Sequence, residues 1–255
     1  MVEKSNKEKA IIVLESLQKE DKRAIKEWVS SEKYIQHNLG FPDGKDALLM
    51  ALGQMEGSIK INIKRAIEDG DFVVLHSEVN FFGPKVSFDI FRFEDGKIVE
   101  HWDNLQEKVE KTKSGHSMTD GSTEITYADK TEENKALLKE LVEDVFIGGK
   151  NDKMQDFFDD DKYIQHNPKF ADGLSGLIKG LEELAKQDNP MEFAENHMIL
   201  GEGNFVLSVS EGNWMGEHVS FYDLFRIEKE KFVEHWDVIE SIPPQEEWKN
   251  QNGKF

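Results

Sequence analysis

Apolar residues follow two different spacings along the chain. Over residues 10–17 they recur three and four positions apart, which predicts an amphipathic helix. Ser5 and Glu8 lie just before this stripe at capping-box spacing, so a helix start is expected there. From residue 59 onward, apolar and polar positions alternate, and Asp-Gly turn signals separate the runs. The pattern therefore predicts helices followed by strands.

Two further helices and four strands complete the prediction for this part of the chain. A second helix is expected around Ile25 and Trp28, and a third over residues 47–52, after Asp43-Gly44. The four predicted strands span residues 59–67, 72–82, 86–93 and 97–104. Helices that precede an antiparallel meander are typical of an α+β domain, in which a curved sheet wraps over the helices.

The same series of patterns occurs twice. Tyr34-Ile35-Gln36-His37-Asn38 recurs letter for letter at residues 163–167, and the segment 100–103 (Glu-His-Trp-Asp) recurs at 234–237. A repeat of this kind predicts a duplicated domain. We expect a first domain over residues 1–110, a polar linker over 111–130 and a second domain over 131–255. A long structured tail of the first copy is the alternative for residues 107–134. Helices of the second copy are expected over residues 136–145, 154–157 and 177–185.

The last predicted hairpin of each copy carries candidate chemistry. Gly96 in a left-handed conformation predicts a three-residue loop that pairs Phe93 with Lys97. This register places Asp89 opposite His101, with Asp103 one diagonal step away on the same face. The inner face is expected to hold Asp89, Phe91, Val99, His101 and Asp103. The equivalent candidates in the second copy are Asp223, His235 and Asp237, although Glu230 replaces the turn glycine.

Two carboxylates and an imidazole on a core face suit general acid–base catalysis. Burial raises the pKa of a carboxyl group, and a neighbouring carboxylate raises it further. The alternative is that these side chains lie at a solvated sheet edge and bond only to one another. Both copies keep the two aspartates 14 residues apart, which modestly favours a shared site.

Composition excludes several classes of function. The chain has 32 Lys and Arg residues against 51 Asp and Glu residues, a net charge of −19, which argues against binding to nucleic acid or anionic lipid. No run of residues is apolar enough for a membrane span, and the N-terminal residues have no signal-peptide core. Cysteine is absent, so disulfides and thiolate metal sites are excluded. We expect a cytoplasmic protein.

Several motifs together resemble the SnoaL-like proteins of the nuclear transport factor 2-like superfamily. They are Tyr-Ile-Gln-His-Asn, the following Asp-Gly, and the segments 201–207, 222–226, 233–237 and 252–255. The resemblance covers nearly all of both copies. It implies a cone-shaped domain, in which three helices pack on a strongly bent antiparallel sheet around a deep apolar pocket.

The resemblance also implies a site. SnoaL is a polyketide cyclase that closes a ring by aldol condensation without a metal or cofactor, and its general acid/base aspartate matches Asp103 and Asp237 here. Asp89 and Asp223 stand where that cyclase has a histidine. His101 and His235 are the residues that would supply the imidazole.

Five further residues are expected to bind substrate: Tyr34, His37, His76, Tyr163 and His166. The alternative for His37 and His166 is a buried histidine that satisfies backbone groups of its loop. His76 has no counterpart in the second copy, where Val209 stands. A metal site built from His37, His76 and His101 is conceivable, but no two of these histidines have the close spacing of a ligand pair, so no metal is expected.

The hypothesis favoured by the sequence is a cofactor-independent cyclase, isomerase or dehydratase acting on a small hydrophobic molecule with a carbonyl group. A non-catalytic small-molecule binder or adaptor is the alternative, because one fold can serve several functions. The outer face of the last hairpin carries an aromatic and aliphatic stripe in both copies. Exposure of such a stripe to water would favour association with another apolar surface. We therefore expect the copies to pair within the chain as a pseudo-dimer, and the protein to be a monomer in solution.

Overall fold

The fold was analysed in a computed structural model, which describes residues 3–19, 22–53, 59–159, 162–186 and 190–255. Contacts divide the chain into two compact units. Unit 1 comprises residues 1–107 together with the C-terminal residues 243–255, and unit 2 comprises residues 108–242. No helix among the described residues is long and apolar enough to cross a membrane.

Unit 1 has the predicted order of helices and strands. Its helices are α1 (Asn6–Ser16), α2 (Arg23–Trp28) and α3 (Lys45–Gly53). Its strands are β1 (Ile35–Gln36), β2 (Lys60–Asp69), β3 (Phe72–Asn80), β4 (Pro84–Glu94) and β5 (Lys97–Glu107). The predicted capping box is present, because the Ser5 hydroxyl accepts from the Glu8 amide and the Glu8 carboxylate accepts from the Ser5 amide.

Unit 2 repeats this plan. Its helices are α4 (Thr131–Glu140), which continues as a wider helical turn over Leu141–Ile147, α5 (Met154–Phe157) and α6 (Gly173–Ala185). Its strands are β6 (Ile164–Gln165), β7 (Glu192–Glu202), β8 (Phe205–Trp214), β9 (Glu217–Glu228) and β10 (Lys231–Ser241).

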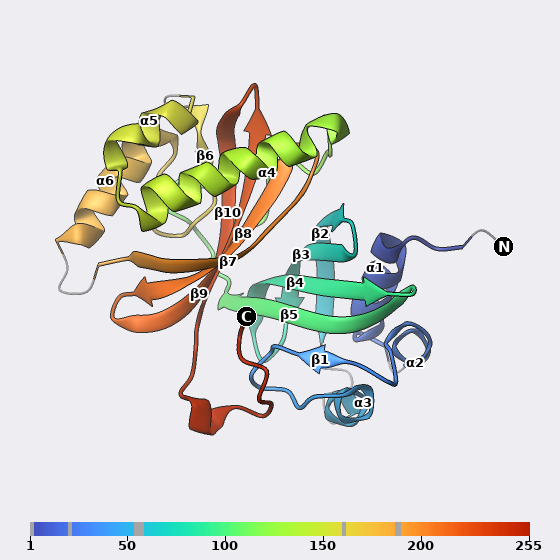
Figure 1. Ribbon diagram of the computed structural model, residues 1–255. Coiled ribbons are helices and arrows are strands. Elements are labelled where there is room, and N and C mark those ends of the chain that lie inside the picture. Colours follow the sequence, from blue (N-terminus) through green and yellow to red (C-terminus); the bar gives the residue numbers. More distant parts are fainter. Residues whose placement is uncertain (1–2, 20–21, 54–58, 160–161, 187–189) are drawn as a thin grey trace. The chain divides into compact units, whose positions relative to one another are not determined.

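Each unit has one five-stranded sheet, ordered β1-β5-β4-β3-β2 in unit 1 and β6-β10-β9-β8-β7 in unit 2 (Figure 1). The long strands are antiparallel, whereas β1 and β6 pair in parallel with the last strand of their unit. β1 and β6 were not predicted, because two residues are too few for a recognisable alternation. Register shifts within the sheets bend the strands.

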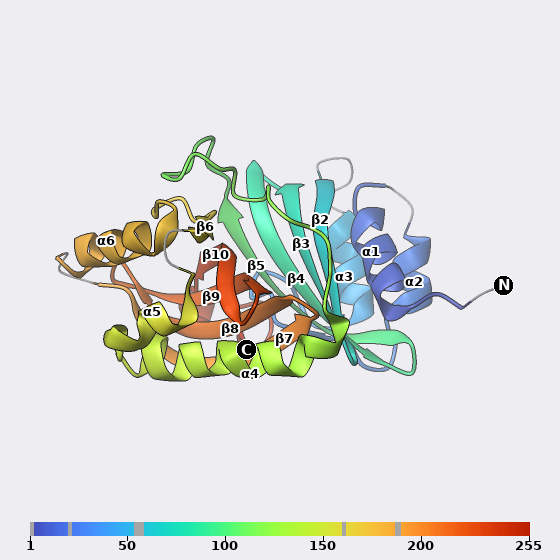
Figure 2. The ribbon, with the colours of Figure 1, turned by 90° about the horizontal axis from the view of Figure 1, so that it is seen from above.

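Helices cover one face of each sheet and enclose the hydrophobic core. In unit 1, Figure 2 shows α1, α2 and α3 together beside β2 and β3. The core there joins helix residues such as Leu14 and Ile25 to strand residues such as Leu75, Phe91 and Ile98. Unit 2 builds the corresponding core from α4–α6 and the inner face of its sheet. The predicted α+β class, with helices packed on a curved antiparallel sheet, is therefore confirmed in both units.

The hairpin that carries the candidate chemistry has a different register from the predicted one. Its loop has two residues, because Glu94 pairs with Lys97, and both Asp95 and Gly96 have positive φ, at 48° and 71°. This is the geometry of a type I′ turn, whose twist matches that of the flanking strands. A bulge between Ile98 and Glu100 then shifts the pairing, so that Asp89 lies opposite Asp103.

The prediction that Asp89 lies opposite His101 is therefore wrong, and Phe91 takes that place. The assignment to a face survives beyond the bulge, because the shift is two residues in total and strand side chains alternate with period two. At the bulge the assignment fails: Ile98, rather than Val99, belongs to the helix-facing core.

Unit 2 keeps the same turn without its glycine. Lys229 and Glu230 have positive φ, at 50° and 62°. The pairing of Arg226 with Glu234 and of Asp223 with Asp237 matches that in unit 1. Glu230 thus adopts the left-handed conformation despite a cost of about 1–2 kcal/mol, and the two sites remain equivalent.

The packing of the tails differs from the expected domain boundaries. The last 13 residues were assigned to the second domain, but they pack in unit 1. The expected linker 111–130 lies in unit 2, where hydrogen bonds hold it; for example, the Lys113 amide donates to the Pro168 carbonyl. The alternative for residues 107–134 was a tail of the first copy, and residues 108–134 instead group with unit 2.

The stripe on the outer face of the last hairpin includes Trp102 in the first copy and Trp236 in the second, and both are buried. Trp102 is 5% exposed and stacks on His37, and Trp236 is fully buried and stacks on His166. These contacts lie within one unit each. Association of the copies within one monomeric chain stays a prediction, which sedimentation equilibrium of the intact protein would test.

Candidate functional site

The Tyr-Ile-Gln-His-Asn motif turns alternate side chains into the unit. Its central residues form β1, where Gln36 pairs with His101 of β5. The Gln36 amide donates to Asp43 Oδ1 at 2.8 Å, which fixes the loop that leads into α3. Tyr34, Gln36 and Asn38 line a cavity in unit 1. The motif thus delivers three polar side chains to the inner face of the sheet.

Gln36 determines which nitrogen of His101 carries a proton. Gln36 Oε1 accepts from the Asn38 amide at 2.9 Å, so the atom that faces His101 Nδ1 at 3.0 Å is an acceptor. His101 Nδ1 must therefore donate. This leaves Nε2, which lies 3.2 Å from Asp89 Oδ1, as the second functional nitrogen of the ring.

The contact between His101 Nε2 and Asp89 requires one further proton. Either the imidazole is fully protonated and faces a carboxylate, or a neutral imidazole accepts from a protonated Asp89. Burial raises the pKa of Asp89, whereas its bond to His101 lowers it. Both forms carry one mobile proton on the His101–Asp89 pair, and Ser87 holds the other Asp89 oxygen at 3.1 Å.

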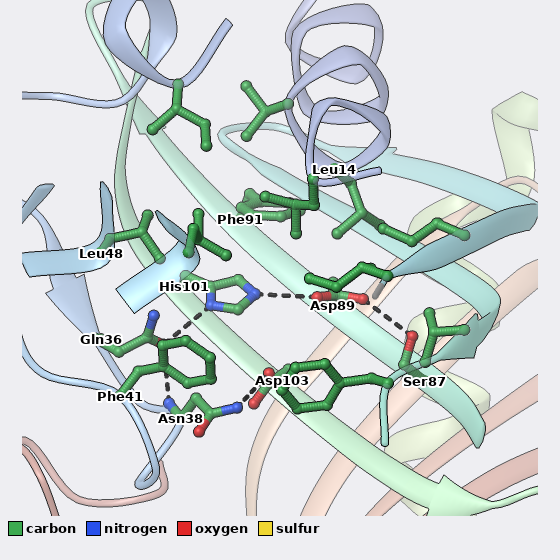
Figure 3. Close-up of a pocket in the computed structure, with 18 of the residues that line it drawn as sticks. Leu14, Gln36, Asn38, Phe41, Leu48, Ser87, Asp89, Phe91, His101 and Asp103 are labelled. Carbon is green, nitrogen blue, oxygen red and sulfur yellow. Dashed lines mark hydrogen bonds and ion pairs between the residues drawn. The ribbon is translucent and has the colours of Figure 1, made fainter. Parts of the chain in front are cut away.

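The carboxylate of Asp103 is hydrogen-bonded through only one of its two oxygens among the described residues. Asn38 Nδ2 donates to Asp103 Oδ2 at 2.7 Å, and the Gly40 amide donates to Asn38 Oδ1 at 2.8 Å, which fixes the orientation of the Asn38 amide. Among the described residues, no group donates to Asp103 Oδ1, although Asp103 is only 6% exposed. Figure 3 shows His101 between Gln36 and Asp89, and Asn38 reaching Asp103. One carboxylate oxygen is therefore available to a bound molecule.

The rest of the cavity wall in unit 1 is apolar. Residues of the helices, the strands and the motif loop surround a space of about 110 Å³, among them Leu14, Leu48, Phe41, Phe91 and Leu105. Tyr34 is buried at this wall, and its oxygen accepts from Gln36 Nε2 at 3.3 Å, which leaves its own O–H to donate. Burial raises the pKa of the Tyr34 phenol, so the group stays a hydrogen-bond donor.

Unit 2 has the same constellation. Gln165 Oε1 accepts from the Asn167 amide at 2.9 Å and from His235 Nδ1 at 2.8 Å, and His235 Nε2 lies 3.0 Å from Asp223 Oδ1. Asn167 donates to Asp237 Oδ2. Burial raises the pKa of Asp237 to about 6, and the nearby Asp223 adds to this effect. The cavity above these groups has a volume of about 640 Å³.

The structure brings together most of the predicted site. Asp89, His101, Asp103 and Tyr34 line one cavity, and their second-copy equivalents Asp223, His235, Asp237 and Tyr163 line the other. Their roles in catalysis or binding stay predictions.

Three predicted substrate-binding histidines do not line the cavities of the described residues. His37 stacks on Trp102 and contacts Glu100 and the Gly253 carbonyl. His166 makes the equivalent contacts with Trp236, Glu234 and the Ser117 carbonyl. His76 contacts Arg65 and stacks on Phe88. Since side chains alternate along a strand, His37 and His166 point away from Gln36 and Gln165.

Sequence reasoning missed two functional positions in each unit. Gln36 and Asn38, with Gln165 and Asn167, hold the imidazole and the aspartate of the site. The alternation of side chains could have indicated them, because in a short strand the residues on either side of His37 share the face of Tyr34. Without the pairing of β1 to β5, nothing indicated which face was the inner one.

The same groups could hold a metal ion. One ligand atom each of Asp89, His101 and Asp103 lies within 4.8 Å of the others, as do those of Asp223, His235 and Asp237. Binding would use His Nε2, because Nδ1 donates to the glutamine, and it would displace the mobile proton. A third such group, Glu195, His197 and Glu211, lies on β7 and β8.

Comparison with known protein families matches residues 13–101 to the SnoaL-like domain. Unit 1 therefore contains a SnoaL-like domain. Unit 2 repeats the elements and the site of unit 1. Comparison with curated proteins found no match.

Three similar solved structures each correspond to less than half of this chain. An NTF2-like protein of unknown function from Cytophaga hutchinsonii is 15% identical and has a TM-score of 0.37, with 41% of this chain and 93% of that chain covered. IdmH, a proposed polyketide cyclase from Streptomyces antibioticus, is 15% identical and has a TM-score of 0.36, with 40% of this chain and 93% of that chain covered. An LEH-like epoxide hydrolase from M. tuberculosis is 20% identical and has a TM-score of 0.35, with 40% of this chain and 82% of that chain covered.

Proposed function

We propose that each unit is an acid–base enzyme site that removes a proton from carbon next to a carbonyl group. The observation that carries this proposal is the pairing of a proton-bearing His–Asp couple with a second aspartate. That aspartate, Asp103 or Asp237, has one buried oxygen to which no described group donates. A base and an acid side by side at the end of an apolar cavity suit this reaction class.

The proposed step needs only groups of the chain. Asp103 Oδ1, or Asp237 Oδ1 in unit 2, takes the proton from the carbon, and the electron pair of the C–H bond forms the enolate. The tyrosine O–H donates to the developing oxygen, and the mobile proton of the His–Asp couple neutralises it. Attack of the enol carbon on a second carbonyl of the substrate gives aldol ring closure, and return of the proton to a different carbon gives isomerisation. The substrate class is a small hydrophobic carbonyl compound, and the proposed chemistry requires no cofactor.

The raised pKa of Asp237 supports the assignment of a base. A carboxylate whose pKa lies near 6 is ionised at neutral pH and accepts a proton more readily than an ordinary surface carboxylate. The asparagine beside it supports the ionised form, because Asn167 can donate to a carboxylate oxygen.

Deuterium incorporation tests this proposal without knowledge of the natural substrate. A panel of hydrophobic ketones and β-diketones is incubated in D₂O with the protein, and enolisable positions are followed by NMR. We expect protein-dependent exchange that the double variant Asp103→Asn/Asp237→Asn loses, whereas the variant Glu228→Gln, at an exposed carboxylate, retains it. Exchange that is equal in both variants would contradict the proposal.

The second candidate is a small-molecule binding protein without catalysis. The cavity of unit 2 favours this alternative, because about 640 Å³ lies within the range of most ligand pockets. Saturable binding of a hydrophobic ketone to unit 2 without any deuterium exchange would favour this function over the first.

A further inference from the structure

Each unit is completed by the chain segment that follows the last strand of the other repeat. In unit 1 the segment is residues 249–255, which follow β10, and in unit 2 it is residues 112–121, which follow β5. We call these segments the C-terminal clamp and the central clamp. Both contact the loop that begins at the Tyr-Ile-Gln-His-Asn motif.

The two clamps make matching backbone contacts. The Lys249 amide donates to the Leu39 carbonyl at 2.9 Å, and the Lys113 amide donates to Pro168, which occupies the same place in the repeat, at 3.1 Å. Four residues further along each clamp, a carbonyl accepts from the motif histidine. Gly253 O lies 3.0 Å from His37 Nδ1, and Ser117 O lies 2.7 Å from His166 Nδ1.

Side chains of the clamps bind the same two groups of the loop. Asn252 Nδ2 donates to the Gln36 carbonyl and to Asp43 Oδ1, both at 3.0 Å. In unit 2 two residues, rather than one, make the corresponding hydrogen bonds. Ser114 Oγ donates to the Gln165 carbonyl at 2.6 Å, and His116 Nε2 lies 3.0 Å from Asp172 Oδ2.

The C-terminal clamp also reaches the strand that carries the candidate base. Lys254 is 5% exposed, and its Nζ donates to the Asp103 carbonyl at 2.7 Å. Asn250 is 4% exposed and donates to the Asn38 carbonyl at 2.9 Å and to the Phe41 carbonyl at 3.0 Å. Buried polar side chains keep such bonds because an unmade bond costs about 1–3 kcal/mol.

We infer that the motif loop of each unit is a binding surface for a peptide segment from the opposite repeat, and that the bound clamp positions the glutamine and asparagine that hold the site. The occupant is defined by chemistry: an extended segment with a polar side chain that bonds the glutamine carbonyl, followed by a carbonyl for the histidine. Asn250, Asn252 and Lys254, with Ser114 and His116, are therefore positioning residues rather than catalytic ones. The site of each repeat therefore depends on the segment that follows the last strand of the other repeat.

Hydrogen–deuterium exchange of the full-length protein tests this inference independently of the proposed reaction. We expect Asn252→Ala to speed the exchange of the amides of Gln36, His37 and Asn38 at least tenfold, while those of residues 165–167 change less than twofold. Ser114→Ala/His116→Ala should have the opposite selectivity. Gln251→Ala, at an exposed clamp residue, is the matched control and should change neither loop.

Two outcomes would overturn the inference. One is unchanged exchange in the motif loop facing the substituted clamp. The other is an equal increase in both loops and in β4, which would indicate general destabilisation.

A second measurement uses the clamp as a free peptide. A chain that ends at Pro244 should lose protection in residues 36–38, and a synthetic peptide of residues 245–255 should restore it. The same peptide with Asn250→Ala and Asn252→Ala should not. Equal restoration by both peptides would contradict recognition through these side chains. If the shortened chain does not fold, the full-length variants still decide the question.

Discussion

Unit 1 and unit 2 hold the same five polar side chains in the same hydrogen-bond pattern but enclose different cavities. The space in unit 1 has a volume of about 110 Å³ and that in unit 2 about 640 Å³. Helix α6 contributes Leu184 and Ala185 to the wall of the larger cavity. The two units therefore share a polar constellation that the strands and the motif loop set, although their cavities differ in volume.

One substitution within the constellation itself also separates the units. Ser87 donates to Asp89 Oδ2 in unit 1, and Phe221 stands at the equivalent position in unit 2. Among the described residues, no group donates to Asp223 Oδ2. The couple in unit 2 therefore has a carboxylate oxygen that a ligand could use, and the couple in unit 1 has this oxygen bound by the protein.

The largest expected difference concerns catalysis in the two units. Asp237→Asn should lower protein-dependent deuterium exchange of a hydrophobic ketone by about 10²–10⁴-fold, the usual contribution of a general base. Asp103→Asn should have a smaller effect on a bulky ketone, because the cavity of unit 1 cannot hold it. NMR rates for both single variants check this expectation. A larger loss in Asp103→Asn would reverse the assignment of the more active unit.

The stability of unit 2 should depend on pH through Asp237. Its pKa is about 6 in the folded protein and 3.8 in the unfolded chain. The folded state therefore binds the proton more tightly, and stability falls as pH rises from about 4 to about 6, by about 3 kcal/mol in total. Asp237→Asn removes this loss, so it should stabilise the protein at pH 7.5 relative to pH 4.5. Urea unfolding at both pH values measures the effect, and an equal midpoint shift at the two would refute it.

The glutamine that orients the imidazole should matter in both units. Gln165→Met removes the acceptor for His235 Nδ1 and for the Asn167 amide, and Gln36→Met does the same in unit 1. Each change should cost about 1–3 kcal/mol, because buried donors lose their partner. The proton resonances of the imidazole should also move. Urea unfolding and ¹⁵N NMR of the histidine ring follow both effects, and an unchanged tautomer in either variant would argue against this role.

The smallest expected effect is that of the serine that distinguishes unit 1. Ser87→Ala leaves Asp89 Oδ2 without its donor, as in unit 2, and should cost about 1 kcal/mol. Thermal unfolding measures the change, and Ser77→Ala, at the position paired with Ser87 on β3, is the control. A loss much larger than that of the control would show that Ser87 also supports packing.

The sequence by itself determined the duplication, the order of helices and strands, and the face shared by Asp89, His101 and Asp103. These follow from local periodicity, and a strand keeps its faces under any register shift of two residues. The sequence did not determine that Asp89 lies opposite Asp103, because the bulge at Val99 depends on packing around the whole hairpin. Equivalent reasoning explains why Gln36 and Asn38 were missed, since only the pairing of β1 with β5 makes their face the inner one.

Only the tertiary structure decided where the two tails bind. Residues 108–127 and 243–255 have no sustained periodicity, so their sequence predicts a linker and an end rather than a binding partner. Their hydrogen bonds to the motif loops join residues 49 to 216 positions apart, such as Ser117 with His166 and Gly253 with His37. Contacts at such separations leave no local pattern in the sequence, because both partners come together only in the folded unit.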